Sequence, residues 1–226
     1  MNAGERLTLR AGSRIANARK VARAAAIILA ATALGFAPAG VQAQETGREL
    51  YEINCSACHG AAGEGNAALQ APVLAGQSET YLARQMANFA SGKRRADDNP
   101  TAAGMIFILE EMAQTDAQAV AKYLSSLAPP SIEQDRAAAS FKGRGLYSGC
   151  TSCHGAKGQG NEALGAPRLS AQYGWYVEGQ IKAFKNGARG FHADDVYGKQ
   201  MKAMADTVRS DEDAVLIVDY LATLEP

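Results

Sequence analysis

The sequence contains Cys55-Ser56-Ala57-Cys58-His59 and, 95 residues further on, Cys150-Thr151-Ser152-Cys153-His154. The two motifs hold all four cysteines of the 226-residue chain. Two thiols three positions apart can form thioethers along one edge of a porphyrin, and the histidine that follows then lies under the iron. We therefore predict two covalent haems of the c type, with these attachment and iron-ligand residues: Cys55, Cys58, Cys150, Cys153, His59 and His154.

Two other uses of a Cys-x-x-Cys pair have to be weighed. A thioredoxin-like redox pair needs no histidine and lies near a βαβ pattern, and this sequence has no alternating strand pattern of useful length. A zinc site would have to join the two motifs into one set of ligands. Two copies in matching contexts favour haem, as does an export segment, because haem attachment takes place outside the cytoplasm.

The similarity between the two halves extends well beyond the motifs, at the same offset of 95 residues. A glycine-rich loop, an Ala-Pro pair and a run of aromatic and glutamine positions recur in both halves. The matching pairs include Gly63 with Gly158, Pro72 with Pro167, Gln77 with Gln172, Tyr81 with Tyr176, Gln85 with Gln180 and Phe89 with Phe184. The chain is a tandem duplication of a unit of about 90 residues, which predicts two domains.

The repeat and the prolines between its copies set the expected domain boundaries. Pro129 and Pro130 follow the last apolar helix position of the first copy, and proline stops a helix. We expect a signal peptide over 1–43, a first domain over 44–128, a linker over 129–135 and a second domain over 136–226.

The first 43 residues have the layout of a secretory signal peptide. Six basic side chains precede an apolar run that begins at Ala24, and small residues flank a cleavage site after Ala43. The apolar run is about 14 residues long, whereas a membrane-spanning helix needs about 20. A cleaved signal peptide is favoured over an uncleaved anchor, and the mature protein is expected in the periplasm.

Removal of residues 1–43 changes the charge of the chain. The whole sequence carries 23 basic and 23 acidic side chains, and the mature part would keep 17 and 22, a net charge of about −5. An acidic protein repels nucleic acid and anionic membranes. Nucleic acid is therefore not an expected partner, and the charge favours docking onto a basic surface of a redox protein. After cleavage no further stretch is long and apolar enough to span a membrane.

Apolar spacing predicts helices in both copies. A short helix is expected before each haem motif, over 48–53 and 144–147, and a middle helix is expected to begin near Ser78 and near Tyr173. A last helix is indicated by apolar positions at 117, 120, 121, 124 and 127, repeated at 214, 217, 218, 221 and 224. The predicted fold class is all-α, with two tandem domains, each built around one haem whose apolar surface supplements a small core.

Methionine is the expected sixth iron ligand, because a thioether raises the reduction potential and suits electron transfer. Each copy offers two methionines ahead of its last helix, and their distances in sequence from the tyrosine of that helix can be compared between the copies. Met105 lies 18 residues before Tyr123, and Met201 lies 19 residues before Tyr220. The spacing selects this pair as ligands. The remaining methionines are expected to pack in the core: Met112 and Met204.

Pro72 and Pro167 each lie 13 residues after the histidine of their motif. A carbonyl at this position could accept the Nδ1 proton of the histidine and so orient the ring. A proline that only shapes the loop is the alternative, and the equal spacing favours the orienting role.

For several polar and aromatic residues the sequence leaves two alternative roles. His192, whose counterpart in the repeat is Asp97, is expected in a surface loop, and replacement of Met201 as a ligand is the alternative. Arg94 and Arg189 match across the repeat and either pair with haem propionates or are solvated. Three aromatic residues either line the haems or pack in the core: Tyr81, Trp175 and Tyr176.

In these motifs the chain resembles a dihaem class I cytochrome c of the cytochrome c4 type. The resemblance depends on the paired Cys-x-x-Cys-His motifs, on the Leu74-Ala75-Gly76-Gln77 run, on Tyr81-Leu82-Ala83-Arg84-Gln85 and on the late methionines. It covers nearly all of the mature chain. It implies two all-α domains that face each other, His/Met haems with close edges, and periplasmic electron transfer, often to a terminal oxidase.

The leading interpretation is an electron carrier that passes single electrons between a respiratory donor and an acceptor such as a terminal oxidase. Its expected partners are redox proteins, either a membrane-bound oxidase or a quinol-oxidising complex. One alternative is a dedicated cytochrome subunit of a dehydrogenase or oxidase complex, for which the apolar run 105–109 is a candidate contact. The other is a dihaem redox enzyme, which needs an open iron position that two methionine ligands would close.

Overall fold

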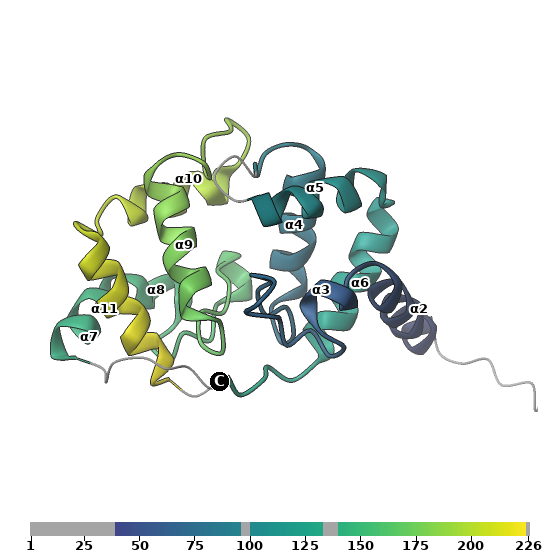
Figure 1. Cartoon of the computed structure of the whole chain (residues 1–226), viewed down its shortest axis with the longest axis horizontal. Helices are drawn as coiled ribbons and strands as arrows, with labels where there is room; N and C mark the ends of the chain where they lie inside the picture. The colour runs from purple at the N-terminus through teal and green to yellow at the C-terminus, as the bar shows by residue number, and fades with distance from the viewer. Residues whose placement is uncertain (1–38, 96–99, 133–139, 225–226) are drawn as a thin grey trace, which may run out of the picture. The chain divides into compact units, whose positions relative to one another are not determined.

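The computed structural model describes residues 39–95, 100–132 and 140–224 (Figure 1). The expected signal peptide lies outside the described residues up to position 38, and its last five residues begin the first described helix. The expected linker, 129–135, is described as far as 132 and has no regular secondary structure there.

The first copy of the repeat contains helices before, within and after its haem motif. The helix ahead of the motif is longer than predicted, because it begins well before position 48. The elements are α2 (Ala39–Asn54), α3 (Ser56–His59), α4 (Glu79–Ala90), α5 (Pro100–Glu111) and α6 (Gln114–Ser126).

The second copy repeats this order with two added 3₁₀ turns. The elements are α7 (Phe141–Tyr147), η1 (Ser148–Cys150), α8 (Thr151–His154), η2 (Glu162–Leu164), α9 (Gly174–Lys185), α10 (Val196–Ala205) and α11 (Asp211–Ala222). In the described part of the chain, β structure is limited to two single-pair bridges, Asn66 with Ala71 and Asn161 with Ala166. The predicted all-α class is confirmed.

Side-chain caps mark the starts of α4 and α11, and the start of α4 lies where the sequence predicted it. The hydroxyl of Ser78 accepts a hydrogen bond from the Tyr81 amide at 3.2 Å, at the start of α4. Ser210 does the same for the Asp213 amide at 3.1 Å, at the start of α11. These bonds satisfy amides that have no partner within the helix.

Each copy has its own apolar core, built on its last helix. In the first copy, α6 packs against α4, and the core residues are Tyr51, Leu82, Val120, Ala121 and Leu124. In the second copy, α11 packs against α7 and α9 (Figure 1), and the core residues are Tyr147, Val177, Val208, Ala214, Ile217, Val218 and Leu221. The predicted apolar stripe of the last helix therefore faces the core in both copies.

A glycine marks the crossing of the first and last helix in each copy. A Cβ added to Gly47 in α2 would lie 2.2 Å from the carbonyl oxygen of Ala119 in α6. A Cβ on Gly143 in α7 would lie 2.3 Å from the carbonyl oxygen of Leu216 in α11. The two backbones touch at these points, so only glycine fits without a shift of the helices.

Over residues 39–95, 100–132 and 140–224, none of the helices combines the length and the apolar character that a membrane crossing requires.

Candidate functional site

The two haem motifs fold in the same way. Each forms a single helical turn, α3 or α8, that ends at a glycine with positive φ, 83° at Gly60 and 80° at Gly155. The histidine of each motif points inward: His59 is 5% exposed and His154 is 4% exposed. None of the four cysteines forms a disulfide, and the second of each pair is exposed. Each motif therefore offers two thiols and one buried imidazole.

A proline carbonyl orients each imidazole. Nδ1 of His59 lies 3.0 Å from the carbonyl oxygen of Pro72, and Nδ1 of His154 lies 2.9 Å from that of Pro167. Because a carbonyl only accepts, Nδ1 donates and Nε2 keeps its lone pair. Burial lowers the pKa of both histidines, while the proline carbonyl acts in the opposite direction. The result is a neutral imidazole with Nε2 available to a metal ion, which fits a haem iron.

A buried tyrosine closes the loop of each motif. The hydroxyl of Tyr51 donates to the carbonyl oxygen of Gly60, and that of Tyr147 donates to Gly155 at 2.7 Å. Burial raises the pKa of both tyrosines far above the usual range. The alignment of the two halves did not pair these tyrosines, because Tyr51 precedes its motif by four residues and Tyr147 precedes its motif by three. Ahead of the motifs the two halves match at an offset of 96 residues in place of 95, which pairs Gly47 with Gly143 and Tyr51 with Tyr147.

The methionines of the second copy lie in different environments. Sδ of Met201, in α10, lies 3.5 Å from Nε2 of His154. Met204 is 41% exposed, so the expectation that it packs in the core was wrong. In the first copy, Met105 lies in α5 and is half-buried, and Met112 follows the end of that helix. His192 accepts a hydrogen bond from the Asp194 amide at 3.2 Å, in an exposed loop. The imidazole and the thioether that face each other in the second copy are donors of the kinds that a haem iron can take.

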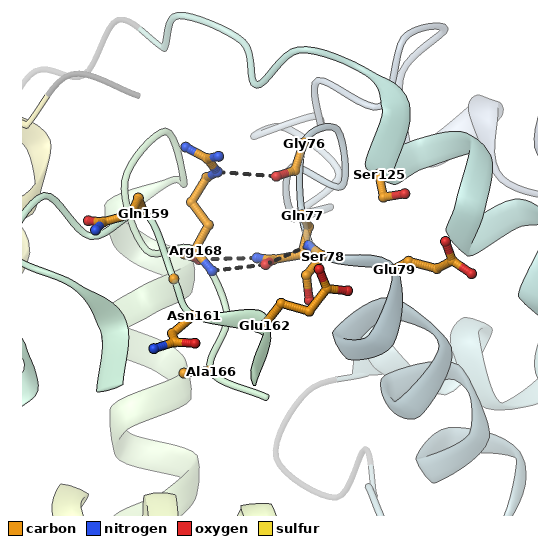
Figure 2. A pocket seen from close by; sticks show the side chains of 11 residues that line it. Gly76, Gln77, Ser78, Glu79, Ser125, Gln159, Asn161, Glu162, Ala166 and Arg168 are labelled. Carbon is orange, nitrogen blue, oxygen red and sulfur yellow. Dashed lines mark hydrogen bonds between the residues drawn. The ribbon is translucent and has the colours of Figure 1, made fainter. Parts of the chain in front are cut away.

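Two glutamines join the copies through reciprocal backbone contacts. The side-chain amide of Gln77 donates a hydrogen bond to the backbone carbonyl of Arg168 at 3.1 Å and accepts one from the backbone N–H of Arg168 at 2.8 Å. Figure 2 shows both bonds. The side-chain amide of Gln172 donates a hydrogen bond to the backbone carbonyl of Val73 at 2.9 Å and accepts one from the backbone N–H of Val73 at 3.0 Å. Since both glutamines and both backbone positions match across the repeat, the contact has an approximate two-fold symmetry.

Arg94 and Arg189 are buried, at 9% and 8% exposed, which rules out the solvated alternative. Both guanidiniums bind the amide oxygens of the same two glutamines, Gln85 and Gln180. Arg94 also donates to the hydroxyl of Tyr176 at 3.1 Å, and Arg189 makes the corresponding bond to Tyr81. These six residues also match across the repeat.

Comparison with known proteins places this geometry among haem proteins. Residues 44–128 and 140–225 match the family described as Cytochrome c. The chain is 32% identical over 184 residues to cytochrome c4 from Azotobacter vinelandii, an alignment that covers 75% of this chain and 84% of the relative. It is 31% identical over 183 residues to the thiosulfate dehydrogenase electron acceptor of Stutzerimonas stutzeri strain A1501, covering 75% and 78% of the two chains.

The fold is similar to that of a solved relative. Reduced recombinant cytochrome c4 from Pseudomonas stutzeri superposes with a TM-score of 0.64 at 27% identity. The superposition covers 80% of this chain and 98% of that one, so the likeness includes both copies of the repeat.

Proposed function

This chain belongs to the cytochrome c family as a dihaem, cytochrome c4-like electron-transfer protein, and on that premise we propose that it works in the periplasm. There it would pass single electrons between a respiratory donor and an acceptor such as a terminal oxidase. Two covalent haems are bound, at Cys55 with Cys58 and at Cys150 with Cys153. The layout of residues 1–43 as an export segment supports the periplasmic location.

The proposed axial ligands are His59 with Met105 and His154 with Met201. The distance of 3.5 Å between Nε2 of His154 and Sδ of Met201 is the observation that carries this assignment. Met105 is assigned by its matching position in the repeat and by its half-buried place in α5. Pro72 and Pro167 are proposed to hold the two imidazoles in the orientation that ligation requires.

Each haem, when bound, supplies an iron that takes up and releases one electron, with a potential raised by thioether ligation. The chain contributes the buried and oriented imidazoles, and a tyrosine hydroxyl holds the glycine carbonyl that follows each of them. Residues that hold both axial positions leave no room for a substrate at the iron, which supports a carrier.

The partner can be tested with holoprotein and with membranes of the organism that makes it. Membranes supplied with quinol should reduce both haems, and oxygen should then reoxidise them in a cyanide-sensitive reaction, as followed in the visible haem bands. A basic partner surface predicts that both rates fall as salt is added, because the mature chain is acidic. A high-spin ferric spectrum, or turnover with peroxide, would contradict the carrier.

A second candidate is a dedicated electron acceptor of a soluble dehydrogenase. The similarity to a thiosulfate dehydrogenase electron acceptor favours it, and so do Ile53 and Phe107, apolar side chains that are 80% and 73% exposed. A thiosulfate dehydrogenase with thiosulfate should then reduce the holoprotein rapidly, whereas quinol-supplied membranes should not. The two donors, tested on one preparation, decide between the candidates.

A further inference from the structure

The outer surface of the second copy has a hollow of about 420 Å³ beside its haem motif, called the α7 hollow below. It is surrounded by α7, by the C-terminal turn of α11 and by residues at and just after the motif, and most of its surface is apolar. Tyr147 and Tyr220 line it, together with Phe141, which is 94% exposed. An apolar hollow beside an exposed aromatic ring is typical of a surface that binds another protein.

The first copy has carboxylates at the corresponding places. At the offset of 96 residues, three glutamates of α2 match uncharged residues that line the hollow: Glu45 with Phe141, Glu49 with Gly145 and Glu52 with Ser148. Arg144, which also lines the hollow, matches Arg48. Arg48 lies 3.4 Å from Glu45 and 3.7 Å from Glu52. For Arg144, the described part of the chain has no carboxylate within 4.0 Å of the guanidinium. The hollow therefore presents a cation that can pair with a carboxylate of another molecule.

The first copy also carries a pair of side chains that is complementary to the hollow. Ile53 in α2 is 80% exposed, and Glu49 lies one helical turn before it on the same face. Glu49 is exposed and, among the described residues, has no basic group within 4.0 Å of its carboxylate. An apolar side chain beside an unpaired carboxylate fits an apolar hollow beside an unpaired guanidinium. Ile53 and Glu49 are together called the α2 knob.

The charges of the two domains favour a contact between unlike ends. Residues 44–128 carry ten acidic and six basic side chains, whereas residues 136–226 carry ten acidic and eleven basic side chains. Two first domains therefore repel each other, and a first domain does not meet this repulsion at a second domain. A contact between the knob of one molecule and the hollow of another is favoured over a symmetric contact between two knobs.

We propose that the α7 hollow binds the α2 knob of a second copy of this chain, with Ile53 against the tyrosine rings and Glu49 paired with Arg144. Such a contact is heterologous, because it joins two different surfaces. It adds molecules head to tail and leaves a knob and a hollow at the two ends of the row.

This contact brings two haem motifs of different molecules together. Ile53 lies two residues before Cys55, and the hollow includes Thr151, which follows Cys150. On the electron-transfer function proposed above, a ferrous iron in one molecule is then oxidised as a ferric iron in the next is reduced. One electron passes, and no bond or proton is exchanged.

The test of the contact is sedimentation velocity of purified holoprotein at increasing concentration. We expect the sedimentation coefficient to rise with concentration and to fall back as salt is added, because both charged partners are exposed. Arg144→Glu should weaken the association about tenfold, since it places two carboxylates together. The double variant Arg144→Glu/Glu49→Arg should restore the association. Arg209→Glu makes the same change of charge ahead of α11, outside the hollow, and should leave the association unchanged.

Several results would overturn the contact. A sedimentation coefficient that stays constant with concentration would leave Ile53 to a contact with a dehydrogenase. Equal weakening by Arg144→Glu and Arg209→Glu would exclude the ion pair, and an association that ends at a dimer would exclude the head-to-tail arrangement. Ile53→Ser and Phe141→Ser should each weaken the association, and no loss in either would exclude the apolar part. Both side chains are exposed, so the thermal midpoint of these two variants should stay unchanged.

The electron step is measured separately, by NMR of mixtures of ferric and ferrous holoprotein. The haem methyl signals broaden with the rate of electron exchange between molecules, and Arg144→Glu should lower this rate about tenfold at equal concentration. Arg209→Glu should not change it. An unchanged rate in a variant that no longer associates would contradict exchange across this contact. Sedimentation requires no electron transfer, so it tests the contact even if the proposed donor and acceptor are wrong.

Discussion

At the scale of single residues, the hydrogen bonds around each histidine explain how a short motif becomes a rigid site. One turn of helix has few internal bonds, so α3 and α8 depend on outside partners. A proline carbonyl holds the imidazole from one side, and a tyrosine hydroxyl holds the following glycine carbonyl. These bonds fix the orientation of the imidazole, which favours its ligation of a metal ion.

Replacement of Tyr147 by phenylalanine should destabilise the holoprotein by about 1 kcal/mol. The ring and its packing against Tyr220 remain, while the hydrogen bond to Gly155 is lost. The cost is moderate because the Gly155 carbonyl still accepts the Gly158 amide at 3.1 Å. Chemical denaturation measures the change. Tyr197→Phe, at a ring that is 43% exposed, should change stability by no more than about 0.5 kcal/mol.

Replacement of Met201 by alanine should remove half of the weak sulfur-to-iron absorption band of the ferric protein. The reason is that one of the two proposed thioether ligands is lost, while Met105 remains. Met204→Ala in the same helix is the matched control, because this side chain is 41% exposed. If the Met204 variant lost the band and the Met201 variant kept it, the ligand assignment would have to be reversed.

At the scale of helices, the crossing of the first and last helix depends on one glycine in each copy. Gly47 and Gly143 lie one helical turn before the buried tyrosines Tyr51 and Tyr147. In each copy the glycine and the tyrosine four residues after it therefore lie on the same face of their helix. This pair of positions aligns the helix that leads into the haem motif with the helix that carries the core.

Alanine at Gly143 should destabilise the second copy, although alanine is the better helix former. Its Cβ would meet the Leu216 carbonyl oxygen at 2.3 Å, and overpacking of this kind costs about 1–3 kcal/mol. The gain in helix propensity is about 1 kcal/mol. Gly145→Ala, in the same helix but with nothing within 4 Å of its Cβ, should be neutral or stabilising. Thermal unfolding of both holoproteins checks the difference, and equal midpoints would contradict the crossing.

At the scale of the whole molecule, the two copies are joined by side chains that the repeat supplies twice. Gln77 and Gln172 each bind the amide and carbonyl of one residue in the other copy. Such paired bonds hold backbone groups that would otherwise be left without partners. A duplicated domain thus gains a specific contact with its own copy, because each residue that serves one half recurs in the other.

The double variant Gln77→Ala/Gln172→Ala should uncouple the unfolding of the two copies. Four hydrogen bonds between the copies are lost, and each backbone group left unpaired costs about 1–3 kcal/mol. Calorimetry of the holoprotein should show one transition in the unchanged protein and two in the variant. Gln114→Ala/Gln118→Ala removes two exposed glutamines of α6 and should keep the single transition. A single, unshifted transition in the first variant would contradict this role.

Much of the fold could be predicted because it depends on local patterns. The helix starts at Ser78 and Ser210 follow from capping chemistry, and the buried stripe of the last helix follows from apolar spacing. The length of α2 could not be predicted in this way, because its first turns carry no apolar periodicity. The role of Tyr51 and Tyr147 was hidden by a shift of one residue, which the 3₁₀ turn η1 absorbs.

By itself the sequence determined that this protein carries two haems in a tandem all-α chain, since thiol and imidazole spacing and an internal repeat are properties of the chain order. Only the tertiary structure decided that Arg94 and Arg189 are buried together and that the sulfur of Met201, which the spacing favoured, comes to face His154. Those outcomes depend on the approach of segments about 50 to 95 residues apart in the sequence. No local pattern encodes such an approach, because it depends on how separate helices pack.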